Sequence, residues 1–548
     1  MMLKRSFALI CSLALLLGLF SACGKKDDGR AAALVYPIAE QARSLDPQLA
    51  QTAAENITAN CFEGLVISYE QGQYLPGVAE SWDVSDDGLV YTFNLYKDAK
   101  WHKPTSFEKT FGKEVVDKFP DLVTAHDFVF AFRRALDPKT GSPYAANLFA
   151  LRNADKVNKS RAPLTDLAVE AMDDFRLKIT LSHRQDDFLK TLTDPICMPC
   201  NQTFFEATGG RYGLGDDYLM CNGPFYLSVW TQDSSILLRK NKDYRQADQV
   251  YPNSVSLRIN PDTDQYAQRV AQGVYSAAPL PQADKSYAQD ADLNLLPFEN
   301  EVGVIALNCS DPGLKNQNLR LALLEVLDHD SLEGLRDGGP KTDTFIPPCC
   351  LRGEFESLLD NKGLKSFTFN EAAAPARFDK ALIELGIDSV TLEFLCPSEF
   401  ERPVREVLQV WQKAFGVQIS AHVVPLTLPE LNERVKSGDF QIALTRVKAE
   451  KSSPGDFLQG FTSDSPSNFI AYKDSLYDIT LEASRLSKDK GALDDQYISA
   501  HNLLLQSAAL LPLNVHTNYL ALARGVEGLG YSSAGDRIYF AHALKKDK

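Results

Sequence analysis

Paired cysteines are the residues whose spacing in this sequence most readily suggests chemistry. The chain holds ten cysteines, among them Cys197-Met198-Pro199-Cys200 and the adjacent Cys349-Cys350. Pairs of this kind occur in zinc sites and in dithiol redox centres. A full zinc site needs two such pairs at a regular spacing that places four ligands around one ion, and that spacing is missing. We therefore expect that the protein holds no metal and no cofactor. The alternative hypothesis is that it is an exported metal-dependent hydrolase that uses the cysteines.

Other sequence signatures of catalysis do not occur. The eight histidines are scattered and form no HExxH pair, and there is no Walker A motif and no GxSxG nucleophile elbow. Aspartate and glutamate are so frequent that chance pairs of carboxylates carry no information about hydrolysis. We therefore expect that the protein is not an enzyme.

The second candidate for chemistry is the charged stretch at 445–450, which reads Thr-Arg-Val-Lys-Ala-Glu. It follows a predicted strand at 440–444, and before it come a strand at 389–396, a helix at 403–415, a strand at 417–423 and a helix at 429–437. This β-α-β-α-β order predicts a parallel or mostly parallel sheet of the α/β class. Ligands of such sheets bind beyond the carboxyl ends of the strands. The candidate ligand-binding residues are Thr445, Arg446, Val447, Lys448 and Glu450.

Composition and charge limit the class of protein. A chain of 548 residues with 44% hydrophobic and 24% charged residues is long enough for two or three domains with cores of their own. The formal net charge is −15 at pH 7. Nucleic acids and anionic membrane surfaces attract basic proteins, so we expect neither as a partner.

The N-terminus predicts export. Lys4 and Arg5 precede an apolar stretch at 7–20, the pattern of a signal peptide over residues 1–22. Ser21-Ala22-Cys23 resembles a bacterial lipobox, although Phe20 stands where leucine is preferred. We expect lipidation of Cys23, a tether over 23–33 and an extracytoplasmic protein, periplasmic or at the cell surface, held on the cell membrane by its lipid. Disulfides form in that location, for instance between Cys197 or Cys200 and Cys221.

A hairpin at 76–101 and several short motifs lead to a family. Asp86-Asp87-Gly88 supplies the hairpin turn, and alternating apolar residues predict a strand after it. The motifs that accompany the hairpin are Ser44-Leu45-Asp46-Pro47, Phe62-Glu63-Gly64-Leu65, Leu136-Asp137-Pro138, Cys221-Asn222-Gly223-Pro224-Phe225-Tyr226 and the helix at 318–328. Each motif is weak by itself. Their order resembles that of the family-5 extracellular solute-binding proteins, the peptide-binding lipoproteins that feed ABC importers.

The resemblance implies a fold and a domain plan. The fold class is α/β, a bilobal periplasmic-binding-protein-like fold of class II and of the large peptide-binding type, with two or three subdomains. The implied divisions are lobe I at 34–75, an accessory subdomain at 76–195, lobe I again at 196–303, lobe II at 304–517 and a C-terminal return to lobe I at 518–548.

The resemblance also implies a function and partners. Such a protein captures short peptides between its lobes and delivers them to an ABC transporter permease, and we expect a monomer. Relatives of the same architecture bind nickel chelates, opines or oligosaccharides, so a non-peptide solute stays open.

The sequence departs from the family at two places. The family's equivalent loop offers a Gly-Trp backbone edge to the peptide and an aspartate to its terminal ammonium, whereas here Arg446-Val447 and Glu450 stand at those positions. Either Glu450 holds an amine, or Arg446, Lys448 and Lys451 favour a ligand carboxylate, or the loop is a solvated rim. The second departure is the stretch at 102–122, which its scattered Lys and Glu predict to be a surface insertion.

Overall fold

The computed structural model describes residues 32–51, 53–68, 74–104, 106–117, 119–185, 188–280, 284–351, 353–358, 363–449, 453–487, 489–532 and 537–546. The signal peptide, Cys23, Glu450 and Lys451 lie outside these residues. Within them, no helix combines the length and the apolar character that crossing a membrane requires.

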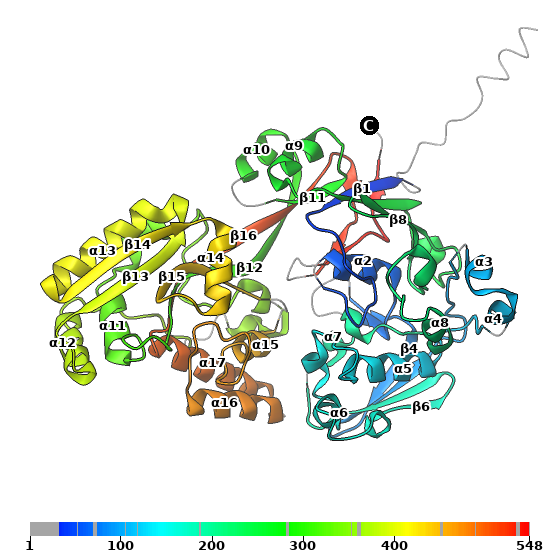
Figure 1. The fold of residues 1–548 in the computed structure, drawn as a ribbon, viewed down its shortest axis with the longest axis horizontal. Coiled ribbons are helices and arrows are strands. Elements are labelled where there is room, and N and C mark those ends of the chain that lie inside the picture. The colour runs from blue at the N-terminus through cyan, green and yellow to red at the C-terminus, as the bar shows by residue number, and fades with distance from the viewer. Residues whose placement is uncertain are drawn as a thin grey trace, which may run out of the picture.

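Two bodies, joined by two long strands, make up the molecule (Figure 1). The strands are β12 (Asn294–Leu307) and β16 (Leu510–Leu522), which pair antiparallel. One hydrophobic core draws on residues between 34 and 298 and between 519 and 543, and two further cores draw on residues between 302 and 513. We call the body with the first core lobe I and the other lobe II. The predicted bilobal α/β fold is confirmed, while the finer domain boundaries stay predictions.

Lobe I contains two four-stranded sheets. One has the order β1-β10-β9-β8 and the other the order β4-β5-β7-β6. The predicted hairpin is the β4–β5 pair, and Gly88 in its turn has φ +70°, which glycine adopts without strain. The strands are β1 (Ala33–Ile38), β4 (Ala79–Val84), β5 (Val90–Leu95), β6 (Val169–Asp173), β7 (Arg176–Thr180), β8 (Phe225–Thr231), β9 (Ser235–Lys240) and β10 (Ser254–Ile259).

Short helices complete lobe I. The helix after Thr124 is α5 (Ala125–Leu136), whose first turn is closed because the Asp127 carboxylate accepts the Thr124 N–H at 2.8 Å. The others are α2 (Ala53–Cys61), α3 (Phe107–Phe111), α4 (Lys113–Asp117), α6 (Ala154–Asn158), α7 (Phe188–Thr191), α8 (Gln202–Ala207), α9 (Tyr266–Ala271) and α10 (Lys285–Asp290).

The C-terminal residues finish the core of lobe I. The Asn60 amide of α2 donates to the Ile538 carbonyl at 2.7 Å and accepts the Phe540 N–H at 3.0 Å. The Phe540 ring meets the Tyr36 ring of β1 edge-on, with centroids 5.6 Å apart. The first and last described segments of the chain are therefore packed together in one body (Figure 1).

The prediction of a surface insertion at 102–122 is only half right. Charged side chains of this stretch are exposed, but Phe107 and Phe119 are buried in the core of lobe I. Both rings pack on Phe204 of α8, at centroid distances of 5.8 and 6.2 Å. These aromatic residues fix the insertion to the core of lobe I. The prediction relied on the charged residues of the stretch and did not take the two phenylalanines into account.

A six-stranded sheet of order β11-β16-β12-β15-β13-β14 extends from lobe I, whose core includes β11 and the end of β16, into lobe II. Its remaining strands are β11 (Ala277–Leu280), β13 (Val390–Pro397), β14 (Ile419–Leu426) and β15 (Ile442–Lys448). The predicted parallel arrangement holds for β14, β13 and β15, whereas β12, β16 and β11 run antiparallel. The sheet is therefore mixed, because strands from distant parts of the sequence join the local β-α-β-α-β unit.

Helices cover both faces of this sheet. One face carries α11 (Gln317–Glu325), α12 (Ala374–Leu385) and α13 (Glu401–Phe415) and the other α14 (Leu428–Ser437), α15 (Pro454–Gln459), α16 (Ser475–Leu486) and α17 (Lys490–Gln506). The helix predicted at 403–415 is α13, and its apolar stripe is buried at Val404, Val407, Trp411 and Phe415. The Trp411 indole also donates to the Leu323 carbonyl at 2.8 Å, which fixes α13 against α11.

Candidate ligand-binding site

The candidate residues at 445–448 lie inside a strand rather than in a loop beyond its end. β15 continues to Lys448 because it pairs antiparallel with β12, with Arg446 opposite Gly303 and Lys448 opposite Glu301. The prediction of a loop after residue 444 was wrong, because only the distant partner strand shows how far β15 extends. Thr445, Arg446, Val447 and Lys448 are thereby brought together on one rigid element.

The other edge of β15 is open at this point. β13 pairs with β15 only at Ile442 and Ala443, and it ends at Pro397. In an antiparallel ladder, alternate residues direct their N–H and C=O groups to opposite edges. The Ala449 N–H bonds to the Asn300 carbonyl on the β12 side at 2.8 Å, so the main-chain groups of Arg446 and Lys448 point to the open edge. Within the described part of the chain, no strand pairs with that edge.

The four side chains divide between the two faces of the sheet. Val447 is buried in the core beneath α15 and α17. Arg446 points to the opposite face, where its guanidinium lies 3.0 Å from Asp337 and 3.8 Å from Glu301. The positive charge of Arg446 is therefore already balanced within the protein.

Asp337 is the centre of a polar cluster beside β12 and β16, the strands that join the two lobes, which we call the hinge strands. Its carboxylate accepts the Asn514 amide at 2.5 Å and is in contact with the His516 imidazole. Burial acts to raise the pKa of Asp337, but the hydrogen bonds from His516 and Asn514 and the charge of Arg446 outweigh it and hold the pKa below its usual value. Asp337 is therefore ionised at neutral pH.

Glycine makes this cluster possible. A Cβ on Gly303 would lie 2.6 Å from the Asn514 side-chain oxygen, so only glycine leaves room for that amide between β12 and β16. A Cβ on Gly339 would lie 1.8 Å from the Val515 carbonyl oxygen. The segment that carries Asp337 can thus lie directly against β16.

Lys448 differs from Arg446 in its surroundings. Its side chain is exposed, and among the described residues no ion pair includes it. Glu450 and Lys451, the other charged candidates of this stretch, lie outside the described residues. Lys448 is therefore the described candidate whose charge stays available to a ligand.

The site also contains a link to the hinge. β12 changes register between Phe298 and Glu301, where the strand passes from lobe I to lobe II. Asn300 lies in this irregularity, and its carbonyl accepts the Ala449 N–H at 2.8 Å. The last described residue of the candidate stretch is thus bonded to the irregular part of β12.

Sequence reasoning did not single out a buried acid in lobe I. Glu63 lines a narrow cavity of ≈ 30 Å³ together with Asn60 and Tyr244. The Tyr244 hydroxyl donates to the Glu63 carboxylate at 2.5 Å, and Arg245 lies 3.8 Å away. Burial nevertheless raises the pKa of Glu63 to about 7. An acidic residue inside the apolar run Phe62-Glu63-Gly64-Leu65 was the signal for it.

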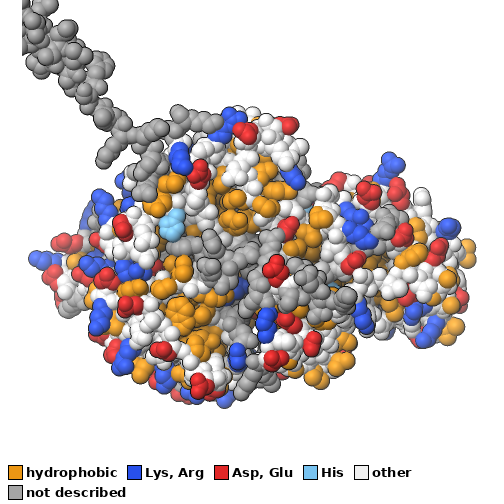
Figure 2. Space-filling model, turned by 180° about the vertical axis from the view of Figure 1, so that it is seen from behind, with side chains coloured by type: hydrophobic (Ala, Val, Ile, Leu, Met, Phe, Trp, Pro, Cys, Tyr) orange, Lys and Arg blue, Asp and Glu red, His pale blue; other side chains and the backbone are white. Residues whose placement is uncertain are grey.

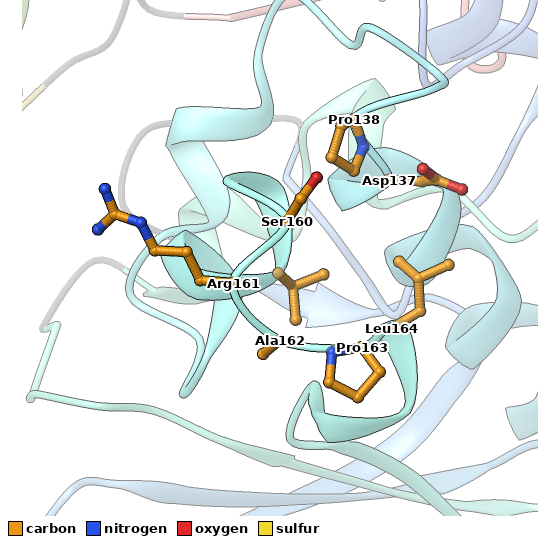
Figure 3. A pocket seen from close by; sticks show the side chains of 8 residues that line it. Asp137, Pro138, Ser160, Arg161, Ala162, Pro163 and Leu164 are labelled. Carbon is orange, nitrogen blue, oxygen red and sulfur yellow. The ribbon is translucent and has the colours of Figure 1, made fainter.

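A larger depression lies elsewhere on lobe I, away from all the candidate residues. It measures ≈ 430 Å³ and is lined by residues at the ends of α5 and α6, including Asp137, Ser160 and Arg161 (Figure 3). Figure 3 shows the Arg161 guanidinium directed away from Pro138 and Leu164. None of the predicted site residues takes part in it.

The cysteines form no cluster with other potential metal ligands. Among the described residues, no group of three His, Cys, Asp or Glu side chains is placed to hold an ion. All eight described cysteines are free thiols. The suggested pairing of Cys221 with Cys197 or Cys200 is wrong, because the thiol that meets Cys221 is that of Cys61.

Comparison with known proteins decides the family. The model of the bacterial extracellular solute-binding proteins, family 5, matches residues 73–469. The chain belongs to this family. The periplasmic oligopeptide-binding protein OppA of Salmonella typhimurium is 26% identical over 92% of this chain and 91% of its own. The probable deoxycholate-binding periplasmic protein YgiS of Escherichia coli is 26% identical over 90% of both chains.

A solved structure agrees with this family-5 assignment. The substrate-binding domain of an oligopeptide ABC transporter from Bacillus anthracis is 26% identical, with a TM-score of 0.72 over 95% of this chain and 100% of its own. Family-5 proteins are solute-binding proteins, which is not a class of enzyme. Curated relatives of this family-5 chain bind peptides.

Proposed function

We propose that this protein captures short peptides between its two lobes and delivers them to an ABC transporter permease, anchored at the extracytoplasmic side of the membrane by a lipid on Cys23. The observation that carries the proposal is the open edge of β15 at Arg446 and Lys448. An extended peptide adds to such an edge as a further strand, and main-chain hydrogen bonds give affinity for many sequences.

The lobes supply the second half of the mechanism. A peptide on the β15 edge would lie near the strands that join the lobes, because Ala449 is bonded to Asn300 in the irregular part of β12. Contacts that the peptide makes to both lobes in the closed form, and to one lobe in the open form, shift the population towards closure. The closed form is the one that the permease would recognise.

The charges of β15 suggest how a peptide is oriented. Arg446 is neutralised by Asp337 and Glu301, so Lys448 is the better partner for a ligand carboxylate. Glu450 follows two residues later and would hold the ammonium group at the other end or on a side chain. The side chains of Thr445 and Val447 would act as supports rather than as ligand contacts.

The test begins with native mass spectrometry of the purified protein, which identifies co-purified ligand. The best-bound peptide is then compared with its N-acetylated form, in wild type and in Glu450→Ala, by calorimetry. If Glu450 holds the ammonium, each change alone should weaken binding by roughly 2–5 kcal/mol and the two together by little more. Equal affinities throughout would remove Glu450 from the site.

The backbone contact has a separate test. N-methylation of single peptide bonds in the same ligand removes one donor at a time, and at alternate positions it should weaken binding at least tenfold. If no position responds, strand addition to β15 is wrong. Anchoring is tested by Cys23→Ser, which should release the protein from the membrane fraction.

A non-peptide solute is the second candidate. The family's Gly-Trp edge is replaced here by Arg446-Val447, and one relative of similar identity carries the name of a probable deoxycholate-binding protein. A steroid-like or other non-peptide mass in the native spectrum, with no peptide, would favour this candidate.

A further inference from the structure

Two buried thiols from distant parts of the sequence lie close together in lobe I. Cys61 is the last residue of α2, and Cys221 stands four residues before β8. The neighbouring Cys221 thiol acts on the Cys61 thiol and raises its pKa. Both residues are almost completely buried, at 0% and 1% exposure.

The backbone around them explains this closeness. The Gly223 N–H donates to the Cys61 carbonyl at 2.9 Å. A Cβ on Gly223 would lie 2.7 Å from the Cys61 carbonyl carbon, so glycine is needed for the approach. The Asn222 side chain accepts the Glu63 N–H at 3.1 Å and donates to the Glu63 carbonyl at 2.8 Å. Three hydrogen bonds thus hold the two cysteine-bearing segments side by side.

The other cysteines of lobe I have different neighbours. The Cys197 thiol donates to the Thr191 carbonyl at 3.2 Å, and Cys200 lies 3.4 Å from the Arg134 guanidinium. In lobe II, Cys349 and Cys350 are adjacent in sequence, with sulfurs 3.9 Å apart. Of these contacts, the one between Cys61 and Cys221 joins thiols far apart in the chain.

We propose that Cys61 and Cys221 form a disulfide bond while the exported chain folds. The thiolate of one cysteine attacks a sulfur of an oxidant that is itself a disulfide, either of a protein or of a small thiol. The thiolate of the second cysteine then attacks the mixed disulfide. The two cysteines lose two electrons and two protons in total, and the oxidant's disulfide becomes two thiols.

The burial of the pair sets the timing. The hydrogen bond from Cys221 and the loss of solvent both raise the pKa of the Cys61 thiol well above its ordinary value. Because the thiolate is the reacting form, the folded and reduced protein should oxidise slowly. We therefore expect the thiol–disulfide exchange to take place during folding, while both thiols are still exposed to solvent.

The bond would also have a structural effect on lobe I. It would close a loop of about 160 residues, which restricts the unfolded chain strongly. It would also fasten the segment that carries Glu63 to the turn before β8, next to the small cavity lined by Glu63 and Tyr244. The inference does not depend on the ligand or on the permease.

The experiment is refolding of the denatured mature chain with a mixture of oxidised and reduced glutathione, and in parallel with a strong reductant. Remaining thiols are alkylated in denaturant, and the peptides are mapped without reduction. We expect one dominant linked peptide that joins Cys61 to Cys221. The oxidised protein should melt about 5–10 °C above the reduced protein.

Variants separate this bond from other oxidation. In Cys61→Ser and in Cys221→Ser, the difference in melting temperature between oxidised and reduced samples should vanish, whereas the matched control Cys197→Ser should keep it. The comparison is made within each variant, so a loss of stability from the substitution itself cancels. If a variant fails to fold, the non-reduced peptide map of the wild-type chain is sufficient to show whether Cys61 is linked to Cys221. Free thiols at both positions, a different partner for Cys221, or a Cys349–Cys350 bond alone would overturn the inference.

Discussion

Two arginine–aspartate pairs, one in each lobe, use the same chemistry in different surroundings. In lobe I, Arg134 and Asp46 lie 2.5 Å apart with side chains 9% and 3% exposed. At the hinge side of lobe II, Arg446 and Asp337 lie 3.0 Å apart with side chains 36% and 18% exposed. The first pair is sealed in a core, and the second borders the open edge of β15.

The other contacts of the two arginine–aspartate pairs also differ: those of the first lie in the core, and those of the second lie on a strand that joins the lobes. The Arg134 guanidinium also donates to Gln48 at 2.7 Å and stacks over the Phe205 ring at 3.9 Å. Arg446 shares Asp337 with Asn514 and His516, which lie on the hinge strand β16. We expect the lobe I pair, which is buried, to contribute mainly to stability. We propose that the lobe II pair, which is partly exposed beside the open edge of β15, belongs to the ligand-binding site.

The largest effect should come from breaking the sealed pair. Asp46→Ala leaves the Arg134 charge buried without its carboxylate, which should lower the free energy of unfolding by about 3–5 kcal/mol. Urea denaturation measures it. The matched control is Glu406→Ala, which removes an exposed pair on α13 and should change stability by less than about 1 kcal/mol. Similar losses in both variants would contradict the assignment.

The next effect concerns the buried Glu63 and its dependence on pH. Folded Glu63 keeps its proton up to about pH 7, whereas in the unfolded chain its pKa is near 4.5. Between these values the folded state binds more protons, so the free energy of unfolding falls as pH rises. Glu63→Gln cannot ionise. Relative to wild type, it should gain about 2–3 kcal/mol between pH 4 and pH 8.

Thermal unfolding from pH 4 to pH 8 measures this difference. Asp127, whose pKa burial also raises to about 7, contributes the same slope to wild type and variant and therefore cancels. Parallel curves for the two proteins would show that Glu63 does not titrate in this range.

A smaller effect is expected at the hinge-side pair. Asp337→Asn keeps the size and an acceptor but removes the charge that balances Arg446. Because the pair is partly exposed, the loss of stability should be about 1–2 kcal/mol. The released Arg446 should also raise affinity for peptides with a free carboxylate relative to amidated ones. An unchanged ratio of the two affinities in calorimetry would place Arg446 outside the ligand's reach.

The smallest effect on stability should come from Lys448→Ala. Lys448 is exposed and unpaired among the described residues, so the free energy of unfolding should change by less than about 0.5 kcal/mol. Binding of a peptide with a free carboxylate should nevertheless weaken, and binding of its amide should not. A loss that is equal for both ligands would assign Lys448 to general electrostatics rather than to the carboxylate.

The features predictable from sequence were those with local causes. The β4–β5 hairpin follows from its turn and alternation, and the α13 stripe follows from helical spacing that ends at Gly416 with φ +59°. Figure 2 shows acidic and basic side chains interspersed among the described residues of the reverse face.

The features that sequence could not give depend on distant partners. The length of β15 and its open edge depend on where β12 pairs and where β13 stops. Arg446 looked available to a ligand because Asp337 lies 109 residues away in the chain. The contact of Cys61 with Cys221 depends on an asparagine and a glycine that no periodicity marks.

The discontinuous core of lobe I also orders events in time. In a chain exported from its N-terminus, residues 34–298 emerge long before residues 519–543, which complete their core. The cores of lobe II lie within 302–513 and need nothing that comes later. We expect lobe II to become protease-resistant first during synthesis, which pulse proteolysis of chains truncated after Thr517 would show. Lobe I cannot complete its core until residues 519–543 have been exported. Until then, Cys61 and Cys221 would remain accessible to an oxidant.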